Sequence, residues 1–242
     1  MSAVTGWWSA LAVTDVNGDG RPDIIAGNVG LNTKYQATPD APTLLFAGDF
    51  DGTGKEQLIE AQYENGALYP LRGRSKLGYA FPWLSKKFPT YKAYGKAKLT
   101  DLFTAERLAS VRRLAATELA SGVFIQDASG RFTFKPLPRS AQMAPINAIV
   151  ARDLDGDGTL DLFCVGNNFG PEPNTGRFDG SLGVLLKGNG HGAFTALTPS
   201  DSGLIVPGDT RAAVCLATPG AKGTMIAVAR CDGPLLLFTS KR

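Results

Sequence analysis

Cysteine and histidine are scarce in this chain: its 242 residues include three cysteines and one histidine. Cys164, Cys215 and Cys231 all lie in apolar, strand-like runs, so we expect small buried side chains rather than a disulfide framework or a metal role. His191 lies in the glycine-rich turn GNGHGAF. A zinc site or a Ser-His-Asp triad would need more such residues around it. We therefore expect a turn residue there, with a general base as the alternative.

Long apolar runs and clusters of one charge are also missing. No run reaches the roughly 18 apolar residues of a membrane span, and MSAVTGWW has neither the basic start nor the apolar core of a signal peptide. Only 19% of the residues are charged and the formal net charge is +3. The cations are scattered apart from Lys86 with Lys87 and Arg112 with Arg113, so we expect no nucleic-acid partner.

Two acidic loops are the strongest signal that the sequence contains. DVNGDGRPD (15–23) and DLDGDGTLD (153–161) each place Asp or Asn at the first, third, fifth and ninth positions and Gly at the sixth. This spacing wraps oxygen atoms around Ca²⁺. A short apolar run precedes and follows each loop, and the twelfth position, where a helix-loop-helix site carries Glu, is Ala26 or Cys164. The pattern therefore predicts two strand-loop-strand calcium sites.

The similarity between the two copies extends beyond the loops. GNVGLNTKY (27–35) and GNNFGPEPNTGRF (166–178) share Gly-Asn, a later Gly, Asn-Thr, a cation and an aromatic residue, which indicates a repeat architecture. A degraded third copy, GDFDGTGKEQ (48–57), keeps Asp49 and Asp51 but has Thr53 and Gln57 at the fifth and ninth positions. We expect it to bind calcium poorly or not at all.

Short apolar runs between turns predict about a dozen strands, and hence about three blades of a propeller. The 29 glycines and 15 prolines fit such frequent turns. Residues 75–114 break the pattern and favour a helical insertion, with Thr104 as a cap and Leu108, Val111 and Leu114 or Ala115 on one face. For its aromatic residues, packing onto the sheets is favoured over a ligand platform; these are Phe81, Trp83, Phe88, Tyr91, Tyr94 and Phe103.

Several segments resemble a known family. DxNxDGxxD after a strand, followed by VLLxGxGxGxF, is similar to the FG-GAP or VCBS repeats, which fold as calcium-loaded β-propellers. GWWSALAVTDVNGDGRPDIIAGNVGLNTKY, KKFPTYKAY with KLTDLF, FGPEPNTGRFDGSLGVLL and MIAVARCDGPLLLF resemble the C-terminal part of large bacterial VCBS repeat proteins. The resemblance implies a mainly β, partial or small propeller, formed as a single domain over residues 1–242.

The resemblance also implies the calcium ligands. Side-chain ligands would come from Asp15, Asn17, Asp19 and Asp23, and from Asp153, Asp155, Asp157 and Asp161; the seventh-position carbonyls would belong to Arg21 and Thr159. An extracellular or periplasmic location is implied for the parent protein, although this chain has no export signal. It begins almost directly in a predicted strand, as a fragment of a longer protein would.

Two functions remain open at this point. In the first, calcium is structural and the module binds a protein or glycan. In the second, calcium polarises the oxygen of a small ester or phosphotriester substrate and a carboxylate acts as nucleophile or base. The catalytic candidates are then Asp179, Glu172 and His191. The candidate ligand-binding residues are Asn32, Lys34, Tyr35, Asn174 and Arg177, for which loop capping is the alternative.

An incomplete propeller also exposes strand edges, which must be covered. We expect a homodimer that completes the ring, with shielding by the helical insertion as the alternative.

Overall fold

The computed structural model describes residues 4–216 and 224–239, which are mainly β. In these residues, fifteen strands form four antiparallel sheets. The chain forms two compact units: unit 1 comprises residues 7–34 with the described residues after 118, and unit 2 comprises residues 4–6 and 35–118. No helix in the described ranges is long and apolar enough to cross a membrane.

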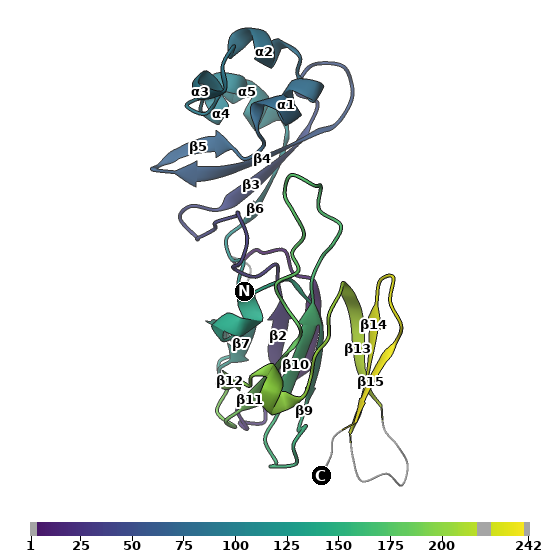
Figure 1. The fold of residues 1–242 in the computed structure, drawn as a ribbon. Helices are drawn as coiled ribbons and strands as arrows, with labels where there is room; N and C mark the ends of the chain where they lie inside the picture. The colour runs from purple at the N-terminus through teal and green to yellow at the C-terminus, as the bar shows by residue number, and fades with distance from the viewer. Residues whose placement is uncertain (1–3, 217–223, 240–242) are drawn as a thin grey trace. The chain divides into compact units, whose positions relative to one another are not determined.

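Unit 1 contains three sheets, shown in Figure 1. The first has the order β1-β2-β7-β8, the second β12-β11-β10-β9 and the third β13-β14-β15. Their strands are β1 (Ala10–Thr14), β2 (Asp23–Gly27), β7 (Gly122–Gln126), β8 (Phe132–Pro136), β9 (Ile146–Arg152), β10 (Asp161–Gly166), β11 (Val184–Gly188), β12 (Phe194–Ala196), β13 (Thr210–Leu216), β14 (Met225–Arg230) and β15 (Leu236–Thr239). Two short helical turns, η1 (Arg139–Gln142) and α6 (Pro199–Ser202), connect them.

The second sheet lies between the other two. Because side chains alternate across a strand, β10 packs on both neighbouring sheets. On β10, Leu162 and Cys164 pack against Ile25 and other residues of the first sheet, whereas Phe163 and Val165 pack toward the third. β9 lies beside both β1 and β13, so the first strands of the three sheets are neighbours. Sheets packed face to face with adjacent first strands have the arrangement of successive propeller blades.

Unit 2 combines one sheet with short helices. The sheet has the order β5-β4-β3-β6, and its strands are β3 (Thr43–Gly48), β4 (Gln57–Glu64), β5 (Ala67–Pro70) and β6 (Arg112–Ala116). The helices are α1 (Arg74–Ala80), α2 (Trp83–Lys87), α3 (Tyr91–Tyr94), α4 (Leu99–Leu102) and α5 (Ala105–Ser110). Phe81, Leu84 and Leu99 are fully buried where the helices pack together with Phe46 and Ile59 of the sheet.

The helical region is as expected, but its end is not. Thr104 does cap α5, because its hydroxyl accepts a hydrogen bond from the Arg107 N–H. The helix ends at Ser110, and Leu114 lies in strand β6, where it pairs with Leu45 of β3. The prediction of helix to residue 114 was therefore wrong, because pairing with β3 outweighed local helix propensity.

The cysteines follow the prediction only in part. Cys164 is buried in β10, where burial raises the pKa of its thiol to about 12. Cys215 is half-buried, whereas Cys231 is exposed in the turn after β14. The expectation that all three are buried was wrong for Cys231, because its apolar run ends before it.

Candidate metal centre in the repeat loops

Three loops of the chain have the same hydrogen bonds between backbone N–H groups and an aspartate side chain. Loop 1 (15–23) joins β1 to β2, loop 2 (153–161) joins β9 to β10, and loop 3 (49–57) joins β3 to β4. In each, the first-position aspartate accepts hydrogen bonds from the N–H groups of the fourth and sixth residues. The N···O distances are 2.8 and 2.7 Å for Gly18 and Gly20 to Asp15, 2.7 and 3.0 Å for Gly156 and Gly158 to Asp153, and 2.7 and 2.8 Å for Gly52 and Gly54 to Asp49.

These six residues are glycine for a conformational reason. All have positive φ, from 77° at Gly18 and Gly54 to 88° at Gly158. L-residues other than Asn and Asp rarely adopt this region, whereas glycine does so without a steric penalty. The sequence thus specifies the shape of each loop through one aspartate and two glycines.

In each loop, the side chain at the ninth position forms a hydrogen bond with the backbone at the second position. Side-chain oxygens of Asp23, Asp161 and Gln57 accept hydrogen bonds from the second-position N–H groups of Val16, Leu154 and Phe50, at 3.0, 3.1 and 2.7 Å. The two aspartates are buried, at 0% and 2% exposure.

The second oxygen of each buried aspartate reaches the third strand of its sheet. Asp23 accepts a hydrogen bond from the Gln126 N–H of β7 at 2.8 Å, and Asp161 accepts one from the Gly188 N–H of β11 at 3.1 Å. Because each carboxylate oxygen has two lone pairs, these bonds leave acceptor capacity for a cation. The ninth aspartate therefore supports the blade and can also serve as a ligand.

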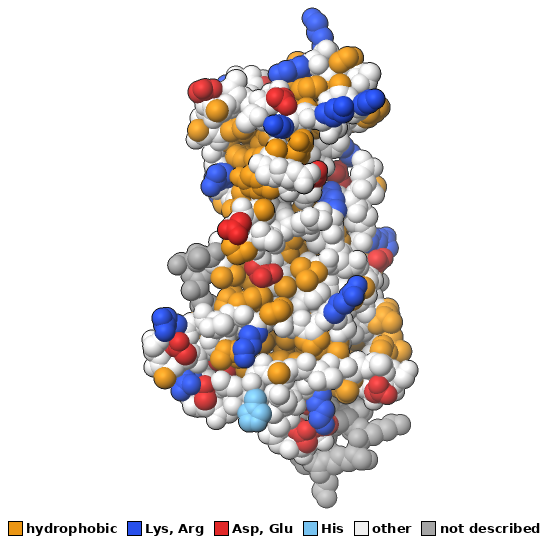
Figure 2. Space-filling model, turned by 90° about the vertical axis from the view of Figure 1, so that its left-hand side faces the viewer, with side chains coloured by type: hydrophobic (Ala, Val, Ile, Leu, Met, Phe, Trp, Pro, Cys, Tyr) orange, Lys and Arg blue, Asp and Glu red, His pale blue; other side chains and the backbone are white. Residues whose placement is uncertain are grey.

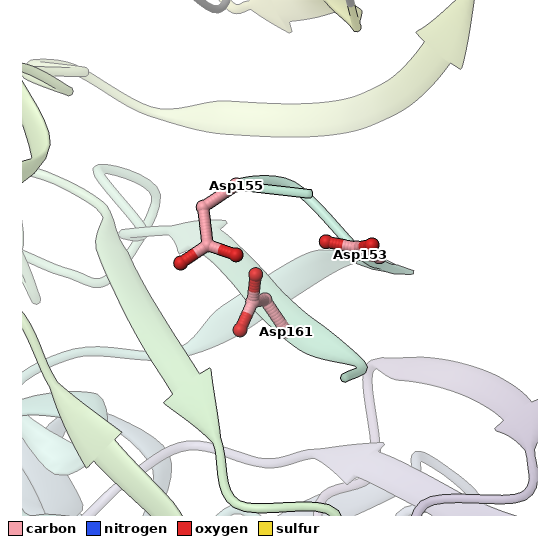
Figure 3. Close-up of side chains that lie close together, drawn as sticks. All are labelled: Asp153, Asp155 and Asp161. Carbon is pink, nitrogen blue, oxygen red and sulfur yellow. The ribbon is translucent and has the colours of Figure 1, made fainter. Parts of the chain in front are cut away.

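Loop 2 brings three carboxylates together, as Figure 3 shows. One oxygen each of Asp153, Asp155 and Asp161 lie within 4.8 Å of one another. Oxygens that bind one Ca²⁺ at 2.3–2.6 Å can be at most about 5 Å apart, so this group fits the ion. Burial raises the pKa of Asp161, and the neighbouring charges of Asp155 and Asp157 act in the same direction.

The fifth-position carboxylate of loop 2 has other partners. Asp157 accepts hydrogen bonds from the Thr159 hydroxyl at 2.5 Å and N–H at 2.8 Å, and lies 3.0 Å from the ammonium of Lys187. These contacts lower the pKa of Asp157 to about 2, with the Thr159 hydroxyl the largest cause. Lys187 Nζ also lies 2.5 Å from Asp155 Oδ2. Sequence reasoning missed Lys187, which lies in β11 and reaches loop 2 only through the packing of the sheet.

Loop 1 holds its charges differently. Asp19 contacts the guanidinium of Arg21 and accepts a hydrogen bond from Asn17 Nδ2 at 2.8 Å. Asp15 has a lowered pKa, chiefly because of the hydrogen bond from the Gly20 N–H. In the described part of the chain, loop 2 provides the one group of at least three clustered carboxylates.

The Gly-Asn pair that follows each loop is used for packing. A Cβ atom at Gly27 would lie 2.4 Å from the Ile146 carbonyl oxygen, and one at Gly166 would lie 1.6 Å from that of Pro145. Asn28 is buried, and its Oδ1 accepts hydrogen bonds from the N–H groups of Trp7 and Val29. The Gly-Asn pair thus allows close approach of the neighbouring backbone and satisfies backbone N–H groups.

The repeat tails contain the predicted ligand-binding residues. Lys34 Nζ donates to Thr175 Oγ1 at 3.1 Å, so the two tails meet within unit 1. Asn32 donates to the Met143 carbonyl, and the Arg177 guanidinium lies 4.5 Å from the centre of the Phe169 ring. Asn174 is exposed in the second tail.

Tyr35 belongs to unit 2, where its hydroxyl donates to Glu60 Oε1 at 3.2 Å.

The catalytic candidates lie in two places along unit 1. Glu172 is half-buried in the second tail, and Asp179 is exposed directly after it. His191 is exposed in the turn between β11 and β12, and in the same turn the Gly192 N–H donates to the Val16 carbonyl of loop 1 at 3.2 Å.

Comparison with known protein families finds a match for the first of the two repeats. Residues 7–35, which contain β1, loop 1, β2 and the first tail, match the family model of the FG-GAP repeat. No curated protein matches the chain. The match and the sheets of unit 1 agree on the type of module. Residues 7–35 are thus similar to an FG-GAP repeat, and the described residues around them have a mainly β, propeller-like fold.

Proposed function

We propose that the chain is a calcium-binding β-propeller module in which calcium is mainly structural and whose surface binds a protein or glycan. The parent protein would act outside the cell or in the periplasm. The observation that supports calcium is the group of oxygens from Asp153, Asp155 and Asp161 in loop 2. The location and the class of ligand rest on the type of repeat.

The donor set of loop 2 suits calcium among the common divalent ions. It consists of oxygen atoms from short acidic side chains, whereas zinc and copper favour nitrogen or sulfur. Calcium accepts six to eight oxygens in irregular geometry, and Mg²⁺ requires a tighter octahedron. Loop 1 has the same backbone frame and offers Asp15, Asn17, Asp19 and Asp23, so we propose a second ion there.

A structural role follows from the position of the ninth aspartate. Asp23 and Asp161 are buried and hold their loops to the third strands of their sheets. Loop 2 places four carboxylates within nine residues, and their mutual repulsion favours opening of the loop. A bound divalent cation would offset this repulsion, so metal binding stabilises the folded blade.

Thermal unfolding tests this proposal. We expect calcium to raise the midpoint of unit 1 relative to a chelator, with magnesium less effective, because binding to the folded state alone adds about 2.7 kcal/mol at a ligand concentration of 100 Kd. Asp155→Asn should reduce the shift, and Asp51→Asn in loop 3 is the matched control that should leave it unchanged. Equal midpoints in calcium and chelator would contradict the proposal.

A second copy of the chain is the proposed partner that completes the propeller. Leu11 and Val13 of β1 are 68% and 65% exposed, on the opposite face from the residues that pack on the second sheet. Val214 and Leu216 of β13 are also exposed, at 52% and 40%. Light scattering would support the dimer if the molar mass is twice that of one chain. The double variant Val13→Glu with Val214→Glu should then have the mass of a single chain. A monomer at all concentrations would contradict it.

The hydrolase alternative is tested separately. It requires calcium-dependent turnover of an ester or phosphotriester that Asp179→Ala or Glu172→Ala abolishes while calcium remains bound. If no ester or phosphotriester in a panel of substrates is turned over, the hydrolase alternative is excluded and the binding module is retained.

A further inference from the structure

Unit 2 contains a long stretch without acidic residues. Between Glu64 and Asp101 no residue is Asp or Glu, whereas eight are basic. These are Arg72, Arg74, Lys76, Lys86, Lys87, Lys92, Lys96 and Lys98. Arg74 and Lys76 lie in α1, Lys86 and Lys87 in α2 and Lys92 in α3, and these three helices pack into one apolar cluster of unit 2.

The exposed cations of this region are lysines. Lys86, Lys87, Lys92, Lys96 and Lys98 are exposed, and none has a carboxylate within ion-pairing distance in the described residues.

The arginines of the stretch have structural partners instead. Arg72 Nε lies 3.3 Å from Glu60 Oε2, and the Arg74 guanidinium donates to the carbonyls of Phe88 and Ser85 at 2.7 and 3.4 Å. Like charges without nearby partners create a positive local potential.

Aromatic rings lie among these lysines. Tyr79 of α1 is 86% exposed and Tyr91 of α3 is 68% exposed, whereas Leu77 of α1 and Leu84 of α2 are buried. The Lys87 ammonium lies 5.7 Å from the centre of the Trp83 ring. Each of these rings combines an apolar body with a polar tip, which is the combination found at the interface of a bilayer and water.

Contacts between the helices make the surface continuous. The Arg74 guanidinium of α1 lies 5.3 Å from the centre of the Tyr91 ring of α3, and the Ser75 and Tyr91 hydroxyls are 2.8 Å apart. α2 packs on α1. In Figure 2 the end of unit 2 that carries the helices shows blue side chains next to orange ones, with few red ones.

We propose that this lysine and tyrosine surface, formed by α1, α2 and α3, docks on an anionic phospholipid bilayer. The chemistry of the exposed cations favours this partner. Lysine is a hydrated point charge on a flexible chain, suited to a diffuse layer of headgroups, whereas the planar fork of arginine favours bidentate binding of a single phosphate. The lysines supply attraction that salt screens, and the tyrosine and tryptophan rings supply interfacial anchoring. This surface lies outside loops 1 and 2.

Vesicle sedimentation of the full chain, in chelator so that calcium does not contribute, tests the proposal. We expect binding to vesicles of equal parts phosphatidylcholine and phosphatidylglycerol, at least about tenfold weaker binding to phosphatidylcholine alone, and weakening by salt. Lys86→Glu with Lys87→Glu should cause a loss of about tenfold on anionic vesicles, and Tyr79→Ala one of about threefold. Lys135→Glu with Arg139→Glu in unit 1 makes the same change in net charge and should have little effect.

Three results would overturn the proposal. They are no binding to anionic vesicles, an equal loss in the unit 1 control, and tighter binding to heparin or single-stranded DNA than to vesicles, which would assign the surface to a soluble polyanion. Unchanged binding by Tyr79→Ala would contradict the role of the rings. Because calcium is absent from the assay and loops 1 and 2 are intact in every variant, failure here is distinguishable from failure of the calcium proposal.

Discussion

Loops 2 and 3 have the same backbone frame but different charges. In both, a first-position aspartate accepts hydrogen bonds from two glycine N–H groups, and a ninth-position side chain accepts one from the second residue. Loop 3 does this with Thr53 and Gln57 in place of two carboxylates. The same hydrogen-bonded frame therefore forms with Thr53 and Gln57 at the fifth and ninth positions as with two carboxylates. What distinguishes loop 2 is its cluster of three carboxylates. Substitutions that change one feature of the two loops at a time can separate the contributions of frame and charge.

The largest expected effect comes from the buried ninth aspartate of loop 2. Asp161→Ala leaves the N–H groups of Leu154 and Gly188 without their acceptor. Both hydrogen bonds are part-buried, and an unsatisfied donor costs about 1–3 kcal/mol, so we expect the free energy of unfolding in chelator to fall by about 2–4 kcal/mol. Denaturant titration measures this. Asp155→Ala, at an exposed position, should change it little, and equal losses in the two variants would contradict the structural role of Asp161.

Loop 3 offers a gain of function. Thr53→Asp with Gln57→Asp restores the carboxylates of loops 1 and 2 on a frame that already exists, so we expect one additional calcium ion per chain. Thr53→Asn with Gln57→Asn is the uncharged control. Calorimetric titration would count the ions. An unchanged stoichiometry in a folded double-aspartate variant would show that the frame and the carboxylates are not sufficient.

Lys187 gives a smaller effect in the opposite direction. Its ammonium lies 2.5 Å from Asp155 and 3.0 Å from Asp157, so an incoming cation must displace it. Because exposed ion pairs are worth about 0–1 kcal/mol, Lys187→Met should tighten calcium binding at loop 2 by about threefold. Lys135→Met serves as the control for net charge. Weaker calcium binding in Lys187→Met would mean that the lysine organises the site instead of competing for it.

The smallest effect concerns the pKa of Asp157. Its folded-state pKa of about 2 lies below the ordinary 3.8. The associated stability is therefore present above pH 3.8 and is lost as the pH falls through about 2. Thr159→Val removes the largest cause of the shift, so the pKa measured by NMR in chelator should move toward 3.8. A pKa that stays near 2 in this variant would assign the shift to the backbone N–H of residue 159 and to Lys187.

Much of the fold was predictable from local patterns. The loops, their flanking strands and the Thr104 cap depend on residues close in sequence, such as Asp15 with Gly18 and Gly20. Strand β6 was missed because its partner β3 is far away along the chain. The exposure of Cys231 was missed because the strand ends just before it.

The candidate site was predictable only as a set of acidic residues. Spacing named Asp153, Asp155 and Asp161, but it did not show that Asp157 pairs with Lys187, since this depends on the neighbouring strand β11. It also did not show that Asp19 pairs with Arg21 or that Asp23 holds Gln126. Such contacts follow from the sheet order and side-chain placement, which repeat spacing does not encode.

Calcium stoichiometry tests the central claim most directly. Equilibrium dialysis of the folded chain should give two calcium ions per chain, falling to one in Asp155→Asn with Asp161→Asn and staying at two in Asp51→Asn. The absence of bound calcium, or the same stoichiometry in the loop 2 variant and the unaltered chain, would contradict the assignment of calcium to these loops.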